Sequence, residues 1–173
     1  SATSLPVLWR DDRVIAHVAK ANPHWREISP DTQALVIVTG PDAYVSPSWY
    51  ATKAEHGKVV PAWNYRAVHL TGVARVHEDP ARLRMAVEEL TNEHEQHREE
   101  PWHLDDAPTS YVDAQLRGIV GVELRVSRVE GKTKLSQNRS QADREGVVAG
   151  LRGSGRPDEQ GVADEMALAI EDH

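Results

Sequence analysis

Alternation of apolar and polar residues is the clearest pattern along the chain. Between Val68 and Val76 every second residue is apolar or small, and histidine, threonine and arginine stand between them. Residues 120–126 repeat this period of two. Such a period is typical of strands with one buried face. The pattern therefore predicts half-buried antiparallel strands in both segments.

Four further segments are compatible with strands. Residues 4–9 and 13–19 are the first two. Residues 34–39 form a third, which is predicted to end at the turn pair Gly40-Pro41. Residues 44–50 are rich in aromatic side chains, but Pro47 cannot donate a ladder hydrogen bond. This last segment is therefore expected at a sheet edge or a bulge.

Helical signals concentrate in the second half of the chain. Asp79 and Pro80 provide an N-cap and a first-turn proline, and Leu83, Val87 and Leu90 follow on one helical face. The tail of this helix, over residues 88–100, is too charged to bury deeply. Three more helices are predicted over residues 108–117, 140–150 and 158–170. The pattern indicates a mainly β (α+β) domain over residues 1–173, with a helical segment from about 139 to 173.

Composition narrows the class of protein. The 173 residues suit one domain, and the lack of cysteine excludes a disulfide scaffold, a cysteine nucleophile and thiolate metal sites. The longest purely apolar stretch, Ala34–Val38, is far shorter than a membrane span requires. No signal-peptide pattern opens the chain. We therefore expect a cytoplasmic protein that does not enter a membrane.

The net charge of −7 is unevenly distributed. Between Arg117 and Arg156 nine basic residues face four acidic ones, which leaves −12 for the rest of the chain. One compact basic segment suits a phosphate-sized anion, although a solvated surface would give the same pattern. Direct DNA binding is doubtful, because it usually requires a broad basic face.

Two aromatic segments and one basic segment are candidates for ligand binding. Residues 46–50 and 60–65 combine flat rings with hydrogen-bonding groups, as a planar heteroaromatic ligand requires. Alternatively, their tryptophans and tyrosines replace the absent phenylalanine in the core. Residues 132–140 place three cations beside a predicted helix N-terminus, where phosphate is favoured. Their alternative is a helix cap with solvated basic neighbours.

Catalytic and metal-binding motifs are not found. The sequence has no Gly-x-Ser-x-Gly elbow, no phosphate-binding glycine loop and no dinucleotide fingerprint. His94 and His97 share a helical face, but surface histidines on a charged helix explain them. We therefore predict no catalytic residue and no metal ligand, and leave open whether the protein is an enzyme.

Several long segments resemble the PaiB family, whose members are FMN-binding split-barrel proteins of the negative transcriptional regulator type. The resemblance is carried by residues 17–25, 40–50, 60–65, 101–102 and 134–139. It implies a bacterial flavoprotein with a six-stranded antiparallel Greek-key barrel, peripheral helices and a homodimer that holds FMN in clefts between its subunits. Family members have an additional N-terminal helix and first strands that are missing here. They also read Ala-Thr-His-Leu-Pro where this chain has Ser4.

The resemblance also implies which residues contact FMN. A strand-to-loop run, two aromatic segments and the basic segment together give the cofactor-binding set. This set is His17, Lys20, Asn22, Trp25, Trp49, Tyr50, Trp63, Asn64, Tyr65, Lys134, Ser136, Gln137, Asn138 and Arg139. The basic members fit the phosphate or the ribityl chain, and the aromatic members fit the ring.

Three functions follow from this resemblance. The first is an FMN-binding regulatory protein that acts indirectly or with a partner, as in the control of sporulation and degradative-enzyme synthesis by PaiB-type proteins. The second is an FMN-dependent oxidoreductase that uses a nicotinamide cofactor, in which the flavin carries the chemistry. The third is a haem-binding or haem-degrading relative on the same barrel. No histidine has a context that marks it as an axial ligand.

Overall fold

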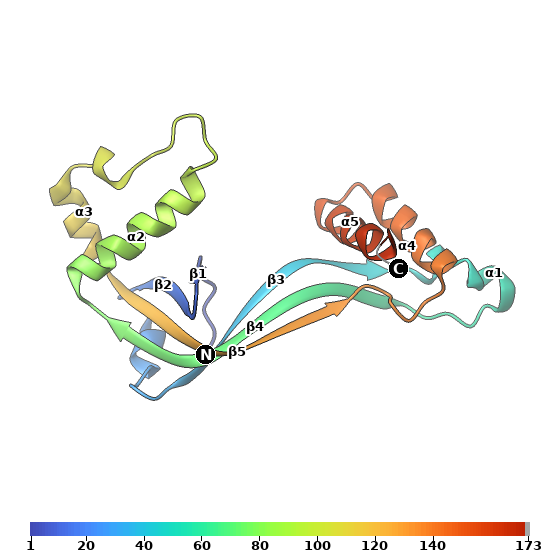
Figure 1. Ribbon diagram of the computed structural model, residues 1–173, viewed down its shortest axis with the longest axis horizontal. Helices are drawn as coiled ribbons and strands as arrows, with labels where there is room; N and C mark the ends of the chain where they lie inside the picture. The colour runs from blue at the N-terminus through green and yellow to red at the C-terminus, as the bar shows by residue number, and fades with distance from the viewer. Residues whose placement is uncertain (172–173) are drawn as a thin grey trace. The chain divides into compact units, whose positions relative to one another are not determined.

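A computed structural model gives the structure of the protein over residues 1–171. Its strands form one antiparallel sheet in the order β1-β2-β5-β4-β3 (Figure 1). The strands are β1 (Leu8–Arg10), β2 (Arg13–Ala19), β3 (Gln33–Val45), β4 (Ala62–His77) and β5 (Ile119–Lys134). The predicted mainly-β architecture with helices is confirmed, with five strands in the described residues where the resemblance implied six.

The four helices predicted from the sequence are present in the described residues, but the one that begins at Pro80 ends at Glu95, before the predicted tail to residue 100. The helix over residues 52–56 and the three short 3-10 helices were not predicted. The α-helices are α1 (Thr52–His56), α2 (Pro80–Glu95), α3 (Thr109–Leu116), α4 (Gln141–Gly153) and α5 (Pro157–Glu171). The short 3-10 helices are η1 (Pro23–Glu27), η2 (Pro47–Trp49) and η3 (Leu104–Asp106). The Asp79 side chain accepts a hydrogen bond from the Arg82 N–H and so caps α2 as predicted. None of the helices in residues 1–171 is long and apolar enough to cross a membrane.

The chain divides into two compact units, which the sequence pattern did not separate. Unit 1 contains residues 1–36 and 70–129, and unit 2 contains residues 37–69 and the chain from 130 onward. Strands β3, β4 and β5 contribute residues to both units. Each unit has its own buried apolar residues and is described separately below.

Unit 1 buries one face of the pairing between β2 and β5. Val14, Ala16 and Val18 alternate on β2 and are all nearly inaccessible to solvent, as are Val120 and Leu124 on β5. Because side chains alternate between faces, the intervening residues of β2 lie on the opposite face. A separate apolar cluster joins α2, η3 and α3 through Leu83, Leu104, Val112 and Leu116.

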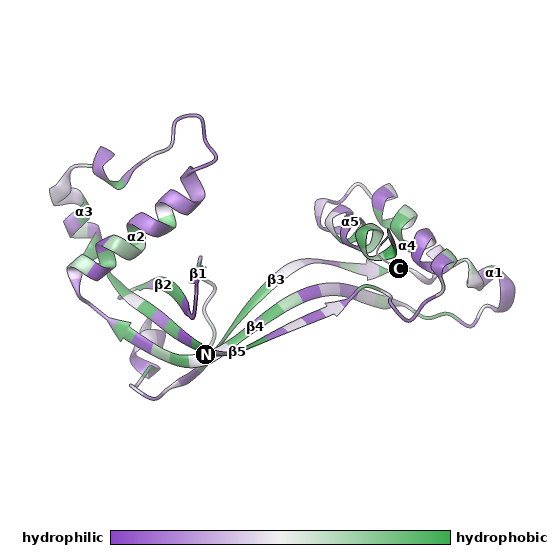
Figure 2. Ribbon diagram, in the orientation of Figure 1, coloured by the Kyte–Doolittle hydropathy of each residue, from purple (hydrophilic) through white to green (hydrophobic). Residues whose placement is uncertain are grey.

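Unit 2 packs two helices against its strands. The α4–α5 pair lies over these strands in Figure 1, and Figure 2 shows hydrophobic residues interspersed with hydrophilic ones along both helices. The core comprises Ala43, Val45, Tyr50, Leu135, Val147, Val148, Leu151, Val162, Ala163 and Met166. Trp49 approaches α4 so closely that only glycine fits at the two helix positions that face it. A Cβ atom on Gly146 would lie 2.2 Å from the Trp49 carbonyl oxygen, and one on Gly150 would lie 2.3 Å from the indole ring.

Three strand predictions need correction. The strand predicted over residues 4–9 begins only at Leu8, as β1. The strand predicted to end at Gly40-Pro41 continues to Val45. Because β3 is the edge strand of the sheet, the missing N–H of Pro41 need not remove a ladder hydrogen bond. Residues 46–50 are not a strand, since the Ser46 side chain accepts a hydrogen bond from the Ser48 N–H and caps η2.

Candidate functional site

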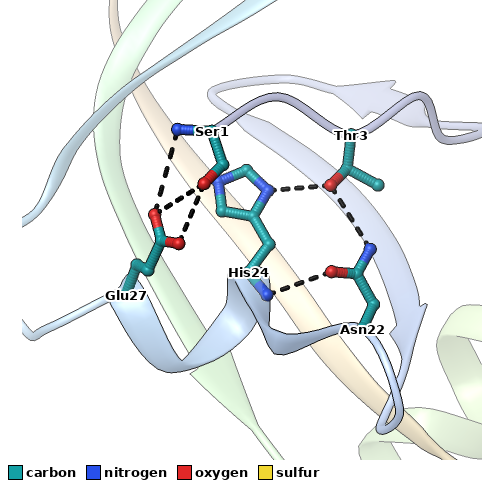
Figure 3. A network of polar contacts seen from close by, with 5 residues as sticks. All are labelled: Ser1, Thr3, Asn22, His24 and Glu27. Carbon is teal, nitrogen blue, oxygen red and sulfur yellow. Dashed lines mark hydrogen bonds and ion pairs between the residues drawn. The ribbon is translucent and has the colours of Figure 1, made fainter.

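The turn after β2 contains three of the predicted FMN contacts, Lys20, Asn22 and Trp25, and each of them has a partner within the protein. The side-chain oxygen of Asn22, Oδ1, accepts a hydrogen bond from the His24 backbone N–H at 3.0 Å. Its amide donates to the Thr3 hydroxyl at 3.3 Å, and that hydroxyl lies 2.8 Å from His24 Nδ1 (Figure 3). Asn22 therefore caps η1 and ties the turn to the segment before β1.

Trp25 and the backbone fix the position of Lys20. The Trp25 indole N–H donates a hydrogen bond to the Lys20 carbonyl oxygen at 3.2 Å, and the Lys20 N–H donates to the Gly118 carbonyl at 2.8 Å. The Arg26 guanidinium lies 5.0 Å from the centre of the Trp25 ring. Trp25 thus acts as a support for the turn that carries Lys20.

Lys20 lines a cavity of about 470 Å³ in unit 1. The cavity is formed by the end of β4, the start of α2 and the end of α3. Its lining residues are Lys20, Glu78, Pro80, Ala81, Leu83, Arg84, Asp113, Leu116 and Arg117. Three cationic side chains therefore meet apolar leucines in a space of the size that small-molecule sites usually have.

The cations of this cavity differ in their partners. The Lys20 ammonium lies 2.6 Å from a Glu78 carboxylate oxygen, and Arg84 lies 2.6 Å from Asp105. These ion pairs are partly exposed, so each contributes little to stability, and another anion can replace the carboxylate. The Arg117 side chain has no hydrogen bond or ion pair with any residue in 1–171. Arg117 is thus a free donor in the lining of the cavity.

His17 lies on the opposite face of β2 from the core of unit 1. It pairs with Gly121 of β5, and a Cβ atom on Gly121 would lie 2.4 Å from the imidazole of His77. Paired residues of antiparallel strands share a face, so His17 and His77 flank Gly121 on one face. Nδ1 of each histidine is buried without a partner in the described residues.

Both histidines favour the neutral state. Burial lowers the pKa of His17 below its ordinary value of 6.5. Burial, followed by the charge of Arg82, also lowers the pKa of His77, while Glu123 and Asp79 oppose this change. An imidazole with an unpartnered nitrogen can accept a hydrogen bond from a ligand or donate one to it.

The aromatic candidates of unit 2 are split between core and surface. Tyr50 is buried in the core, and Trp49 packs against α4. Trp63 is 49% exposed, and its indole N–H donates a hydrogen bond to Asp42 at 2.9 Å. Its ring lies edge-on to Tyr44 at 6.3 Å between centres. Trp63 and the half-buried Tyr65 are therefore the predicted aromatic contacts that a ring could reach.

Asn64 and Ser136 form a buried polar pair. The Asn64 amide donates hydrogen bonds to the Ser136 hydroxyl at 3.1 Å and to the Met166 sulfur at 3.2 Å. The Ser136 hydroxyl also lies 3.2 Å from the Asn64 carbonyl oxygen. Asn64 is completely buried, and Ser136 has a left-handed φ of 58°. Both side chains thus hold the 134–139 turn against the core.

The remaining members of the basic segment are divided between side chains with internal contacts and exposed side chains. The Gln137 side chain accepts from the Leu135 N–H at 2.8 Å and donates to the Thr133 carbonyl at 3.0 Å. The Arg139 guanidinium lies 4.6 Å from the centre of the Tyr50 ring. Lys134 and Asn138 are exposed, and neither side chain has a partner in residues 1–171. These two side chains offer free donors, and so does the Arg139 guanidinium, which contacts the Tyr50 ring but has no hydrogen bond or ion pair with residues 1–171.

A buried carboxylate completes the polar interior of unit 2. Asp143 accepts hydrogen bonds from the Thr52 N–H at 2.9 Å and from the Thr52 hydroxyl at 2.9 and 3.0 Å. Burial alone would raise its pKa, but these hydrogen bonds and the charge of Arg139 outweigh burial and hold the pKa below its ordinary value. Asp143 thus anchors α1 to α4.

The arrangement brings together some residues that the sequence did not connect. Lys20 shares its cavity with Arg84 and Arg117, neither of which was predicted as a site residue. Arg117 does begin the basic segment found by charge counting, which is a usable signal. Arg84 carries no such signal, because only the fold places it there. No cluster in the described chain has the three ligands that a metal ion requires.

Comparison with known proteins identifies the family. The sequence model described as "Putative FMN-binding domain" matches residues 1–128. The chain belongs to this FMN-binding domain family. FMN, the cofactor that the resemblance implied, is the one named in this description. The match contains nearly all of unit 1 but ends before Lys134.

Relatives support the predicted PaiB resemblance. The chain is 35% identical to Bacillus subtilis "Protease synthase and sporulation protein PAI 2" over 99% of this chain and 80% of that protein. It is 34% identical to an uncharacterized Emericella nidulans protein over 80% of this chain and 66% of that one. The protein is thus an FMN-binding, PaiB-like family member.

A solved structure shares the fold. The FAD and heme binding protein from Mycobacterium smegmatis superposes with a TM-score of 0.55 and 20% identity. The match covers 84% of this chain and 64% of that chain. At this identity the likeness concerns the fold alone, and it agrees with the predicted flavin-protein split-barrel architecture.

Proposed function

We propose that the protein binds FMN through unit 1, with the phosphate at the cavity that Lys20 and Arg117 line. The observation that carries this proposal is the family match to residues 1–128, which contains this cavity. A phosphate dianion suits ammonium and guanidinium donors beside one another. The leucines of the cavity offer apolar contact to the rest of the ligand.

The residues of unit 1 fit FMN chemically. Arg117 has a free guanidinium, and Lys20 holds Glu78 in an exposed ion pair that a phosphate can replace. His17 adds a buried imidazole nitrogen without a partner in the described residues. When bound, FMN would supply redox chemistry, whereas these side chains would bind its negatively charged phosphate and orient the molecule.

The basic segment 134–139 is the competing phosphate site. It lies beyond the family match, and its serine, glutamine and arginine contact other parts of unit 2. Lys134 and Asn138 are exposed, and the Arg139 guanidinium has no hydrogen bond or ion pair with residues 1–171, so a phosphate site there would depend on these three side chains. A comparison of Lys20 with Lys134 therefore separates the two hypotheses.

The deciding experiment is a titration of the protein with FMN and with riboflavin, in which binding is monitored by flavin fluorescence. Lys20→Ala and Arg117→Ala should each weaken FMN binding about tenfold and leave riboflavin binding nearly unchanged, because riboflavin lacks the phosphate. Lys58→Ala, which removes another exposed lysine, is the matched control. If Lys134→Ala instead weakens only FMN, the phosphate lies at the basic segment and our assignment is wrong.

We further propose a regulatory role of the PaiB type that does not involve direct DNA contact. The support is the similarity to the Bacillus protein, which is named for protease synthesis and sporulation. The net charge of −7 disfavours a duplex-binding surface. Tight, salt-sensitive binding of the purified protein to its own promoter would contradict this proposal. Rapid reduction of bound FMN by a nicotinamide cofactor, with turnover of an acceptor, would instead indicate an oxidoreductase.

A homodimer is the assembly that we propose for this protein. Strand β3 is an edge strand, and its Leu35, Ile37 and Val38 are 51%, 54% and 44% exposed. Exposed apolar edge strands are typical of association sites. Light scattering after gel filtration should give twice the mass of the 19.2 kDa chain. Replacing Ile37 by Lys should shift the protein toward monomer, and an unchanged dimer would place the interface elsewhere.

A further inference from the structure

A second hollow lies in unit 1, on the sheet itself. It has a volume of about 250 Å³ and is lined by Arg13, Val73, Arg75, Glu123 and Arg125. These residues come from three strands, β2, β4 and β5. Arg13 and Arg125 are cross-strand partners, so their side chains start from the same face. Three arginine residues therefore line one small concave surface.

The carboxylates nearby do not neutralise these guanidinium groups. Glu123 lies 3.6 Å from Arg13 and 3.1 Å from Arg82, which approaches from α2. Asp12 lies 3.8 Å from Arg13 and 3.5 Å from Arg125. These four arginines, counting Arg75, exceed the two carboxylates by two positive charges.

Arg75 is the group without a counter-ion. Its side chain is exposed and has no ion pair or hydrogen bond with any residue of the described chain. A positive hollow is notable in a protein whose net charge is −7. Since surface arginines normally interact with acidic neighbours when these are abundant, an excess of two charges at one point favours an anionic ligand.

The hollow has the chemistry of a phosphate site. A guanidinium fork matches two oxygens of one phosphate, and a phosphate monoester carries close to two negative charges at neutral pH. A nucleic acid would require a basic surface much wider than three arginines flanked by Asp12 and Glu123. We propose that Arg75, with Arg13 and Arg125, binds the phosphate group of a small phosphorylated molecule other than FMN.

This hollow is separate from the FMN cavity. Arg13 is the first residue of β2, and Lys20 directly follows the last residue of that strand. A rise of about 3.3 Å per residue therefore puts the Cα atoms of Arg13 and Lys20 roughly 20 Å apart. The two cavities have no lining residue in common. The inference therefore does not require FMN to bind at the Lys20 cavity, but it does require that FMN does not bind in this hollow.

The test is a phosphorus NMR titration of inorganic phosphate with the full chain, in a buffer of low ionic strength. Arg75→Ala should weaken phosphate binding at least tenfold, and Arg125→Ala should weaken it less, because Asp12 already interacts with Arg125. Arg98→Ala is the matched control, since this exposed arginine of the segment after α2 pairs only locally with Glu95.

Three outcomes would overturn the proposal. The first is unchanged phosphate binding by Arg75→Ala. The second is selective loss of FMN over riboflavin in Arg75→Ala, which would make the hollow part of the flavin phosphate site. The third is equal or tighter binding of malonate in the same titration, which would assign the hollow to a carboxylate ligand. Failure of Lys20→Ala to affect FMN would leave all three readouts intact.

Discussion

The cavity beside Lys20 in unit 1 and the 134–139 segment of unit 2 contain similar residue types but use them differently. In the cavity, Arg117 has no partner among the described residues, and Lys20 holds only an exposed ion pair. In the 134–139 segment, Ser136 and Gln137 satisfy internal hydrogen-bonding groups. Similar donors are thus available to a ligand in one unit and hold the fold together in the other.

The difference follows from the cost of burying polar groups. A buried donor or acceptor without a partner destabilises the fold, so polar side chains near a core are used to satisfy it. The segment 134–139 lies against the core of unit 2, and Leu135 belongs to that core. The Lys20 cavity lies at the surface of unit 1, where cations can remain hydrated until a ligand arrives.

The largest expected effect is at Gly146, where α4 meets η2. Gly146→Ala would place a Cβ atom 2.2 Å from the Trp49 carbonyl oxygen, and backbone atoms must shift to relieve this clash. We expect the free energy of unfolding to fall by about 3 kcal/mol, measured by urea denaturation. Gly153→Ala in the same helix meets no atom within 4 Å and should change stability by less than about 1 kcal/mol. Equal effects of the two substitutions would show that Trp49 does not fix α4.

The next effect concerns the buried pair of Asn64 and Ser136. Asn64→Ala leaves a small cavity and removes the partner of the Ser136 hydroxyl, so stability should fall by about 2 kcal/mol. Removing both partners in Asn64→Ala/Ser136→Ala should cost less than the sum of the single substitutions. Riboflavin and FMN affinities of the folded variant should stay unchanged. Loss of flavin binding without loss of stability would restore Asn64 to the site predicted from the sequence.

Local patterns predicted the elements well, because their causes are local. Alternation over 68–76 and 120–126 lies within β4 and β5, and the cap at Asp79 begins α2. The continuation of β3 through Gly40 and Pro41 was missed, because it depends on β3 being an edge strand. Edge position is a property of the whole sheet and leaves no local signal.

The site was harder to predict than the fold. Motifs placed Asn64 and Ser136 in the FMN set, but the two are 72 residues apart and contact each other. Whether a side chain is free for a ligand depends on such long-range partners. Arg84 was missed for the same reason, since only the folded chain brings it to Lys20, whereas Arg117 begins the basic segment found by charge counting.

A smaller effect should separate the two units by pH. In unit 1, His17 and His77 have lowered pKa values, so the unfolded chain binds more protons than the native state just below pH 6.5. Their contribution is therefore complete above pH 6.5 and is lost as the pH falls toward the native pKa values. In unit 2, the pKa of Asp143 is lowered from 3.8, so its contribution persists to more acidic pH and is lost below that value.

Urea denaturation at a series of pH values checks this sign. His77→Gln should flatten the decline that begins near pH 6.5, since glutamine does not titrate. The groups that face His77 are Arg82, Glu123 and Asp79, and they remain in this variant. A decline that begins only below pH 4 would show that neither histidine is buried in its neutral form.

The smallest effect compares two neighbours in the 134–139 segment, both predicted from the sequence to bind phosphate. Gln137→Ala removes hydrogen bonds to the Leu135 N–H and the Thr133 carbonyl and should lower stability by about 1 kcal/mol. Lys134→Ala removes an exposed side chain without a described partner and should change it by less than about 0.5 kcal/mol. Thermal unfolding of the two variants measures the difference. If Lys134→Ala is the more damaging of the two, its ammonium has a structural partner, and the contrast between occupied and available donors fails in unit 2.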